Sequence, residues 1–151
     1  MSAVAAAGAG FLIAVLWFDL MFDVQTRGYA GEILPDEVLA SIGAYYRRVT
    51  TEASPMSRLI PVVMFATVIA IGAEIRNGAA PRWAGWASLA LAVSAIGLAM
   101  ARTVRNAVRL GAAVDSPAVR TSLARAVYRD HLYCFVAMSL VVGLQLIVAL
   151  K

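Results

Sequence analysis

The stretch AVAAAGAGFLIAVLWFDLMF, residues 3–22, carries one charged side chain, Asp19, near its end. A helix that crosses a hydrocarbon core about 30 Å thick needs about 20 mainly apolar residues. The stretch therefore predicts a first transmembrane helix. Three further apolar runs of similar length follow it and predict three more spans, at about residues 56–75, 83–102 and 131–150.

The composition of the whole chain agrees with four spans. Of its 151 residues, 62% are hydrophobic and 15% are charged, whereas soluble domains are about 45–50% apolar and about 25% charged. We therefore expect one integral membrane domain over residues 1–151, an all-α, up-down bundle of four transmembrane helices. Residues 1–10 contain no Lys or Arg, unlike the start of a cleaved signal peptide, so the first helix is expected to be retained.

Two connecting segments also have helical patterns. Residues 34–49, LPDEVLASIGAYYRRV, place apolar side chains on one helical face and predict a short amphipathic helix lying on the membrane surface. Ser116–Pro117 is typical of a helix start, and no Gly or Pro follows before Gly143. The fourth span is therefore expected to be the end of one long helix, and the third span is expected to continue to about Gly111.

The distribution of basic residues predicts the orientation. Ten lie between spans one and two, including the start of span two, or between spans three and four, and three lie on the opposite side. The positive-inside rule then places both termini outside the cytoplasm, in a plasma (inner) membrane protein. The same rule explains the net charge of +4, so we expect membrane lipids and no nucleic acid as partners. Whether the chain forms a homo-oligomer is left open.

Two stripes of small residues suggest how the helices pack. Small side chains at every fourth position let two helix backbones approach closely. The stripes predict that spans one and three contact each other, unless they only reflect the high alanine content. Their members are Ala6, Gly10 and Ala14 in span one, and Ala84, Ser88 and Ala92 in span three.

Polar residues gather at one end of the expected bundle. Asp19 and Asp23 lie one turn apart at the inner end of span one, and Asp130 and His131 begin span four. A charge at the bilayer centre costs about 2.5–3.5 kcal/mol on insertion scales, so ionisable residues near the membrane interior mark candidate sites. In an up-down bundle these ends meet, which predicts a cytoplasm-facing polar pocket with an apolar floor.

The candidate catalytic residues are His131, Asp19 and Asp23. The single histidine is the natural general base or proton carrier, because its unperturbed pKa is close to neutral, and either aspartate could orient it. The candidate binding residues would hold an anionic or enolate oxygen, a carbonyl and an apolar ring. They are Arg102, Arg105 and Arg109 for the oxygen, Asn106 for the carbonyl, and Tyr133 and Trp17 for the ring.

Structural roles for the same residues remain as alternatives. The two carboxylates could form ion pairs with the arginines that fix helix register, and the arginines could hold topology or contact anionic headgroups. Cys134 is the only cysteine, which excludes a disulfide within the chain and a CxxC pair. With one histidine, neither a metal site nor another cofactor is expected. Glu74, Ser94 and Gln145 are interpreted as isolated structural residues.

Two short motifs resemble a known family. They are TVRNAVRLG, residues 103–111, with Asn106 after the third span, and ARAVYRDHLY, residues 124–133, with an aromatic residue before His131. The loop after span one is similar in layout as well. At these positions the chain resembles the anthrone oxygenase-like family of small four-helix membrane proteins, most of whose bacterial members have no assigned function. The resemblance implies cofactor-independent oxygenation of a phenolic or anthrone-like ring, with His131 removing its proton.

Three hypotheses follow for the function. In the first, the pocket binds an amphipathic aromatic small molecule, which an enzyme of the oxygenase type would oxidise. In the second, the chain is a non-catalytic membrane module that binds a partner subunit or anionic lipid through its arginine stripe. A proton-coupled transporter is the third and the least favoured, because four helices with no evident repeat and no charge in mid-membrane form a thin pathway.

Overall fold

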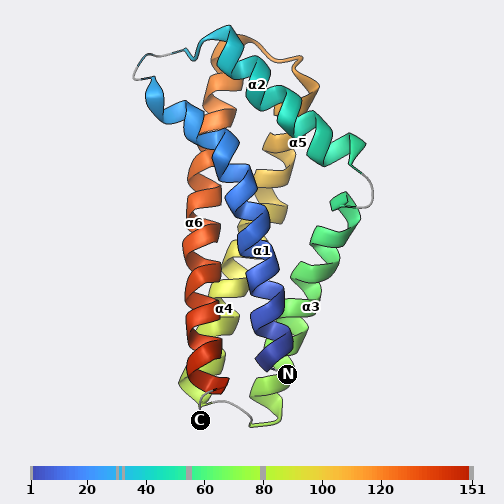
Figure 1. Cartoon of the computed structure of the whole chain (residues 1–151), viewed down its shortest axis with the longest axis vertical. Coiled ribbons are helices and arrows are strands. Elements are labelled where there is room, and N and C mark those ends of the chain that lie inside the picture. The colour runs from blue at the N-terminus through green and yellow to red at the C-terminus, as the bar shows by residue number, and fades with distance from the viewer. Residues whose placement is uncertain (1, 30, 32, 54–55, 79–80, 150–151) are drawn as a thin grey trace.

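The computed structural model describes residues 2–29, 31, 33–53, 56–78 and 81–149, and the regular structure of these residues is helical throughout (Figure 1). Four helices are long and apolar enough to cross a membrane. They are α1 (Ser2–Asp23), α3 (Met56–Arg76), α4 (Arg82–Leu98) and α6 (Pro117–Ala149). The prediction of an all-α chain with four helices able to span a membrane is confirmed.

The third and fourth spans belong to helices longer than a bilayer is thick. A π-helical turn, Ala99–Thr103, and α5 (Val104–Ala112) continue α4, so this span and its extension cover 31 residues, and α6 has 33. At about 1.5 Å per residue, both exceed a hydrocarbon core of about 30 Å. The expected continuation to about Gly111 and the start of α6 at Ser116–Pro117 are both confirmed.

The four long helices form a ring. Helix α1 packs against α3 and α6, and α4 packs against the same two helices. The prediction that spans one and three pack together is wrong, because α1 and α4 are not among the packed helix pairs of the described residues. The stripe residues do not join the two helices: a Cβ atom on Gly10 would meet nothing within 4 Å, and Ser88 of α4 accepts a 3.4 Å hydrogen bond from Gln145 of α6. The close approach of α1 is made by Gly8, which lies outside the stripe and against Thr67 of α3.

Helix α2 (Asp36–Arg47) lies across one end of the bundle beside α5 (Figure 1). Its apolar face, which includes Leu39, Ile42 and Tyr46, is buried in a second core with residues of α5 and α6. The predicted helix is confirmed, and its apolar face packs against protein. The protruding ends of α5 and α6 cover the face that would otherwise need lipid.

A close backbone contact fixes the crossing of α2 and α5. A Cβ atom on Gly111 would lie 2.7 Å from the backbone nitrogen of Arg47, so only glycine permits this approach. Arg47 also donates a 3.2 Å hydrogen bond from Nε to the Gly111 carbonyl. Arg120 of α6 donates a 2.8 Å bond to the Leu39 carbonyl. These contacts hold α2 over the end of the bundle where Asp19, Asp23 and His131 lie.

Candidate functional site

A cavity of about 600 Å³ lies beneath α2, between the spans. This volume falls within the range of about 300–1,000 Å³ that is usual for small-molecule pockets. Apolar side chains form most of its wall, among them Leu12, Leu16, Ile60, Met64, Ile96 and Met138. Asp19, Tyr45, Tyr46 and His131 form a polar wall on one side. The cavity can therefore surround an apolar body and meet a polar group at one end.

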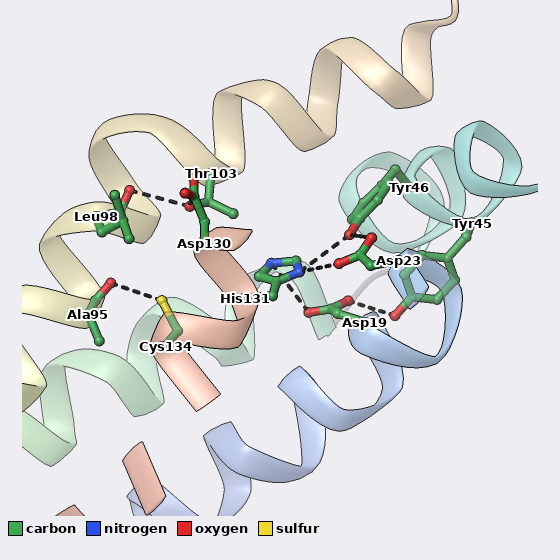
Figure 2. Close-up of polar contacts among 10 residues, drawn as sticks. All are labelled: Asp19, Asp23, Tyr45, Tyr46, Ala95, Leu98, Thr103, Asp130, His131 and Cys134. Carbon is green, nitrogen blue, oxygen red and sulfur yellow. Dashed lines mark hydrogen bonds and ion pairs between the residues drawn. The ribbon is translucent and has the colours of Figure 1, made fainter. Parts of the chain in front are cut away.

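His131 is held by a buried carboxylate (Figure 2). Its Nδ1 lies 2.7 Å from Oδ2 of Asp23, and the Tyr46 hydroxyl donates a 2.6 Å hydrogen bond to the other oxygen, Oδ1. Asp23 is completely buried. An ionised carboxylate only accepts hydrogen bonds, so opposite such a group a neutral imidazole would carry its hydrogen on Nδ1 and keep the lone pair of Nε2. Asp23 thus holds the ring in place through Nδ1.

A second aspartate–tyrosine pair stands on the other side of the imidazole. Tyr45 donates a 2.7 Å hydrogen bond to Oδ1 of Asp19, and Oδ2 of Asp19 lies 3.9 Å from Nε2 of His131. That distance is too long for a hydrogen bond but short enough for a charge on Asp19 to act on the ring. A positive charge on His131 would therefore face two carboxylates.

Both tyrosines come from α2, outside the spans. Burial, followed by the neighbouring aspartate charge, raises the pKa of Tyr45 and of Tyr46 above the usual phenol value. Both phenols therefore stay protonated and act as neutral donors to the carboxylates. The phenols therefore bind the aspartates without supplying a cation, and His131 is the basic side chain that lies against both carboxylates.

The three candidate catalytic residues lie together, and the three candidate arginines lie elsewhere. Arg102 forms a two-point ion pair with Asp130 of α6, with Nε 2.9 Å from Oδ2. Arg109 pairs with Asp115 at 2.9 Å. Arg105 donates to the carbonyl of Ala101 in the preceding turn. None of the three lines the cavity, because they follow a face of the π-helical turn and of α5 that turns away from it.

The remaining candidate binding residues also lie outside the cavity wall. The Tyr133 hydroxyl lies 2.7 Å from that of Ser94, and Tyr133 is half-exposed. Trp17 packs against Phe135 with ring centroids 6.2 Å apart and is 58% exposed. Asn106 is partly exposed on α5. The helical phase of these residues points them to the outer surface, which the sequence pattern did not reveal.

Two alternative interpretations of the sequence also need correction. Asp19 and Asp23 do not pair with arginines, since their partners are Tyr45, Tyr46 and His131. Ser94 and Gln145 are not isolated, because they contact Tyr133 and Ser88. The first correction moves the contacts of the two aspartates from the arginines to residues of α2 and α6.

Sequence reasoning missed the roles of Tyr45 and Tyr46. Tyr46 was expected on the apolar face of its helix, and a phenol on such a face needs a hydrogen-bond partner once it is buried. The pair Asp19 and Asp23, one turn apart, supplies two acceptors of the right spacing. The spacing of the two aspartates is visible in the sequence. Matching it to the tyrosines requires knowing that α2 folds back onto the bundle.

No family model, curated protein or solved structure matches this chain. Among the described residues, no group of three or more His, Cys, Asp or Glu side chains is arranged to hold a metal ion. The geometry of the cavity and of the aspartate–histidine pair is therefore the basis for a proposed function.

Proposed function

We propose that this chain is an inner-membrane protein that binds an amphipathic aromatic small molecule in the bundle cavity, with His131 as proton acceptor. One observation carries the proposal. Beside a largely apolar cavity of about 600 Å³, the imidazole is bonded through Nδ1 to a buried carboxylate at 2.7 Å. A histidine backed in this way is a common general base.

The cavity walls favour a particular class of ligand. The apolar part, with side chains such as Leu12, Ile60 and Met138, suits a fused aromatic ring or an alkyl chain. The polar wall suits a phenol or an enolisable ketone with an acidic hydrogen. When Nε2 of His131 accepts that proton, Asp23 and Asp19 stabilise the imidazolium ion.

The positions of the charges support a cytoplasmic orientation of the site. The arginines that precede span two and follow span three belong to the same end of the chain's up-down arrangement as His131, and the positive-inside rule assigns that end to the cytoplasm. Both termini then lie outside the cytoplasm. A hydrophobic ligand would reach the cavity from the inner leaflet.

The resemblance to the anthrone oxygenase-like family suggests which reaction the site would catalyse. After His131 removes one ring proton, the resulting anion is electron-rich enough to react with O₂. A ring CH₂ group becomes a carbonyl, one oxygen atom enters the product, and the other leaves as water with both hydrogens. O₂ is the only oxidant that this step requires, so no cofactor is invoked.

The alternative of a lipid-binding or partner-binding module acting through the arginine stripe is less well supported. Arg102 and Arg109 are already paired with Asp130 and Asp115. An anionic ligand at the stripe would have to displace those carboxylates. We therefore favour the cavity as the site of function.

The proposal is tested with anthrone as the probe and O₂ uptake as the readout, using purified protein in detergent. His131→Ala should lower the rate by about 100-fold or more, the usual contribution of a general base, while anthrone still binds. Ser139→Ala on the same helix, which is exposed, is the matched control and should keep the parent rate. Equal rates in the parent and His131→Ala would contradict the proposed role of His131.

A further inference from the structure

A second hollow, of about 530 Å³, lies beside the 3-10 turn Val24–Gly28 that follows α1. One face of α6 forms its other side. It shares no lining residue with the cavity. We call it the arginine cleft, and its lining consists of Thr26, Arg27, Ala118, Thr121, Ser122, Arg125, Tyr128 and Arg129.

The charge of the arginine cleft is entirely positive. Three of its eight lining residues are arginines, and none is acidic. Arg125 is engaged with the preceding loop, where it donates 2.5 Å and 3.4 Å bonds to the carbonyls of Gly31 and Tyr29. Over the described residues, Arg27 and Arg129 make no ion pair or side-chain hydrogen bond, unlike Arg102 and Arg109 in the stripe. Two guanidinium groups are thus available to an anion.

Hydroxyl groups complete a set of donors in the cleft. The Thr121 oxygen accepts a 3.1 Å bond from the backbone nitrogen of Leu34, so its own hydrogen is available to donate. Ser122 is exposed, and Tyr128 adds a phenol. A hollow with guanidinium and hydroxyl donors and no carboxylate matches an anion with several oxygen atoms, above all a phosphate group.

The position of the cleft along α6 points to the source of that phosphate. About 20 residues of a helix fill the hydrocarbon core, and within α6 no charged side chain follows His131. Arg129 therefore lies at the boundary of the apolar part of α6, and Arg125 lies one turn beyond it. Arg27 follows the end of α1 by four residues. The cleft therefore lies at the depth of the lipid headgroups.

We infer that the arginine cleft binds the phosphate group of an anionic phospholipid through Arg27 and Arg129. The arginine cleft and the cavity share no lining residue, so the inference stands apart from the proposed function. An anionic lipid held here would clamp the end of α1 to α6, with Arg27 four residues after Asp23 and Arg129 two residues before His131.

The experiment measures phospholipid binding to the full chain by native mass spectrometry in detergent. Phosphatidylglycerol should bind more tightly than phosphatidylcholine. The double variant Arg27→Gln/Arg129→Gln should weaken phosphatidylglycerol binding by about tenfold or more, because two charge-assisted contacts are lost. The control Arg48→Gln/Arg58→Gln removes the same charge from two exposed arginines outside the cleft and should bind like the parent.

Three results would overturn the inference. Equal affinity for the two lipids would show that charge plays no part. Equal weakening by the cleft and control variants would show that net charge alone attracts the lipid. Inorganic phosphate that competes with phosphatidylglycerol at equal concentration would assign the cleft to a soluble phosphate compound. Anthrone turnover is a separate readout, which the cleft variant should leave unchanged.

Discussion

Asp23 and Asp130 are both buried at the same end of the bundle, with 0% and 2% of their surface exposed, yet they have different kinds of partner. Asp130 binds Arg102 at two points and accepts a 3.1 Å bond from Thr103. Asp23 accepts a bond from the neutral Tyr46 phenol and faces His131. A permanent cation fixes the charge of Asp130, whereas the charge of Asp23 is available to stabilise an imidazolium ion.

Helical phase separates Asp130 from His131, although the two residues are consecutive on α6. Their side chains point about 100° apart around the helix axis. One points toward the π-helical turn that follows α4, and the other points toward α1. The Arg102–Asp130 ion pair and the Asp23–His131 pair therefore use the same turn of α6 and share no residue.

The largest effect that tests this comparison should come from Asp23→Asn. Replacing this carboxylate removes the charge that stabilises the imidazolium ion, so we expect anthrone turnover to fall by about tenfold to 100-fold. Asp19→Asn should lower it less, because the 3.9 Å separation from Nε2 is not a hydrogen bond. The rates are measured by O₂ uptake at fixed pH.

The matched variant for that experiment is Asp130→Asn, a second buried aspartate changed in the same way. It should lower the thermal midpoint of unfolding, because the two-point pair with Arg102 is lost, and it should leave turnover near the parent rate. If Asp130→Asn lowers turnover as much as Asp23→Asn, the role of Asp130 is not limited to its ion pair with Arg102.

A smaller effect is expected at alkaline pH. The folded state raises the pKa of Tyr45 and Tyr46, while an unfolded phenol has a pKa of about 10. Their contribution to stability is therefore complete below about pH 10 and declines as the pH rises toward the folded-state values. The thermal midpoint of the parent should fall over this window.

The double variant Tyr45→Phe/Tyr46→Phe should show a lower midpoint at neutral pH and a shallower alkaline decline. The midpoints are compared by nanoscale scanning fluorimetry at about pH 8 and about pH 11. Tyr29→Phe, which removes an exposed phenol, is the control and should follow the parent curve. An unchanged alkaline decline in the double variant would mean that other groups control it.

The sequence predicted the four spans, the long fourth helix and the α2 helix, because each depends on apolar periodicity and on helix-start residues close in the chain. It also placed Asp19, Asp23 and His131 at one end. Their contacts with one another depend on how α1 packs against α6. Their contacts with Tyr45 and Tyr46 depend on where α2 folds, and both are tertiary effects. Local periodicity contains no information about whether an amphipathic face will meet lipid or protein.

The predicted binding residues show a different limit of sequence reasoning. Arg102 and Arg109 follow the inner end of the third span as expected, but each is paired with an aspartate, Asp130 or Asp115, from a segment later in the chain. Counting charges at a membrane end does not reveal which of them are already neutralised. Conversely, the sequence does not indicate that Arg27 and Arg129 line one cleft, because they lie about 100 residues apart.

The central claim is that the cavity beside His131 holds an amphipathic aromatic molecule. The most direct measurement is mass spectrometry of the small molecules that copurify with gently solubilised protein, compared with the cavity-filling variant Ala99→Phe, whose site lines the cavity. We predict that a hydrophobic aromatic compound copurifies with the parent and is depleted in the folded variant. Phospholipid alone, in equal amounts from both proteins, would contradict the claim.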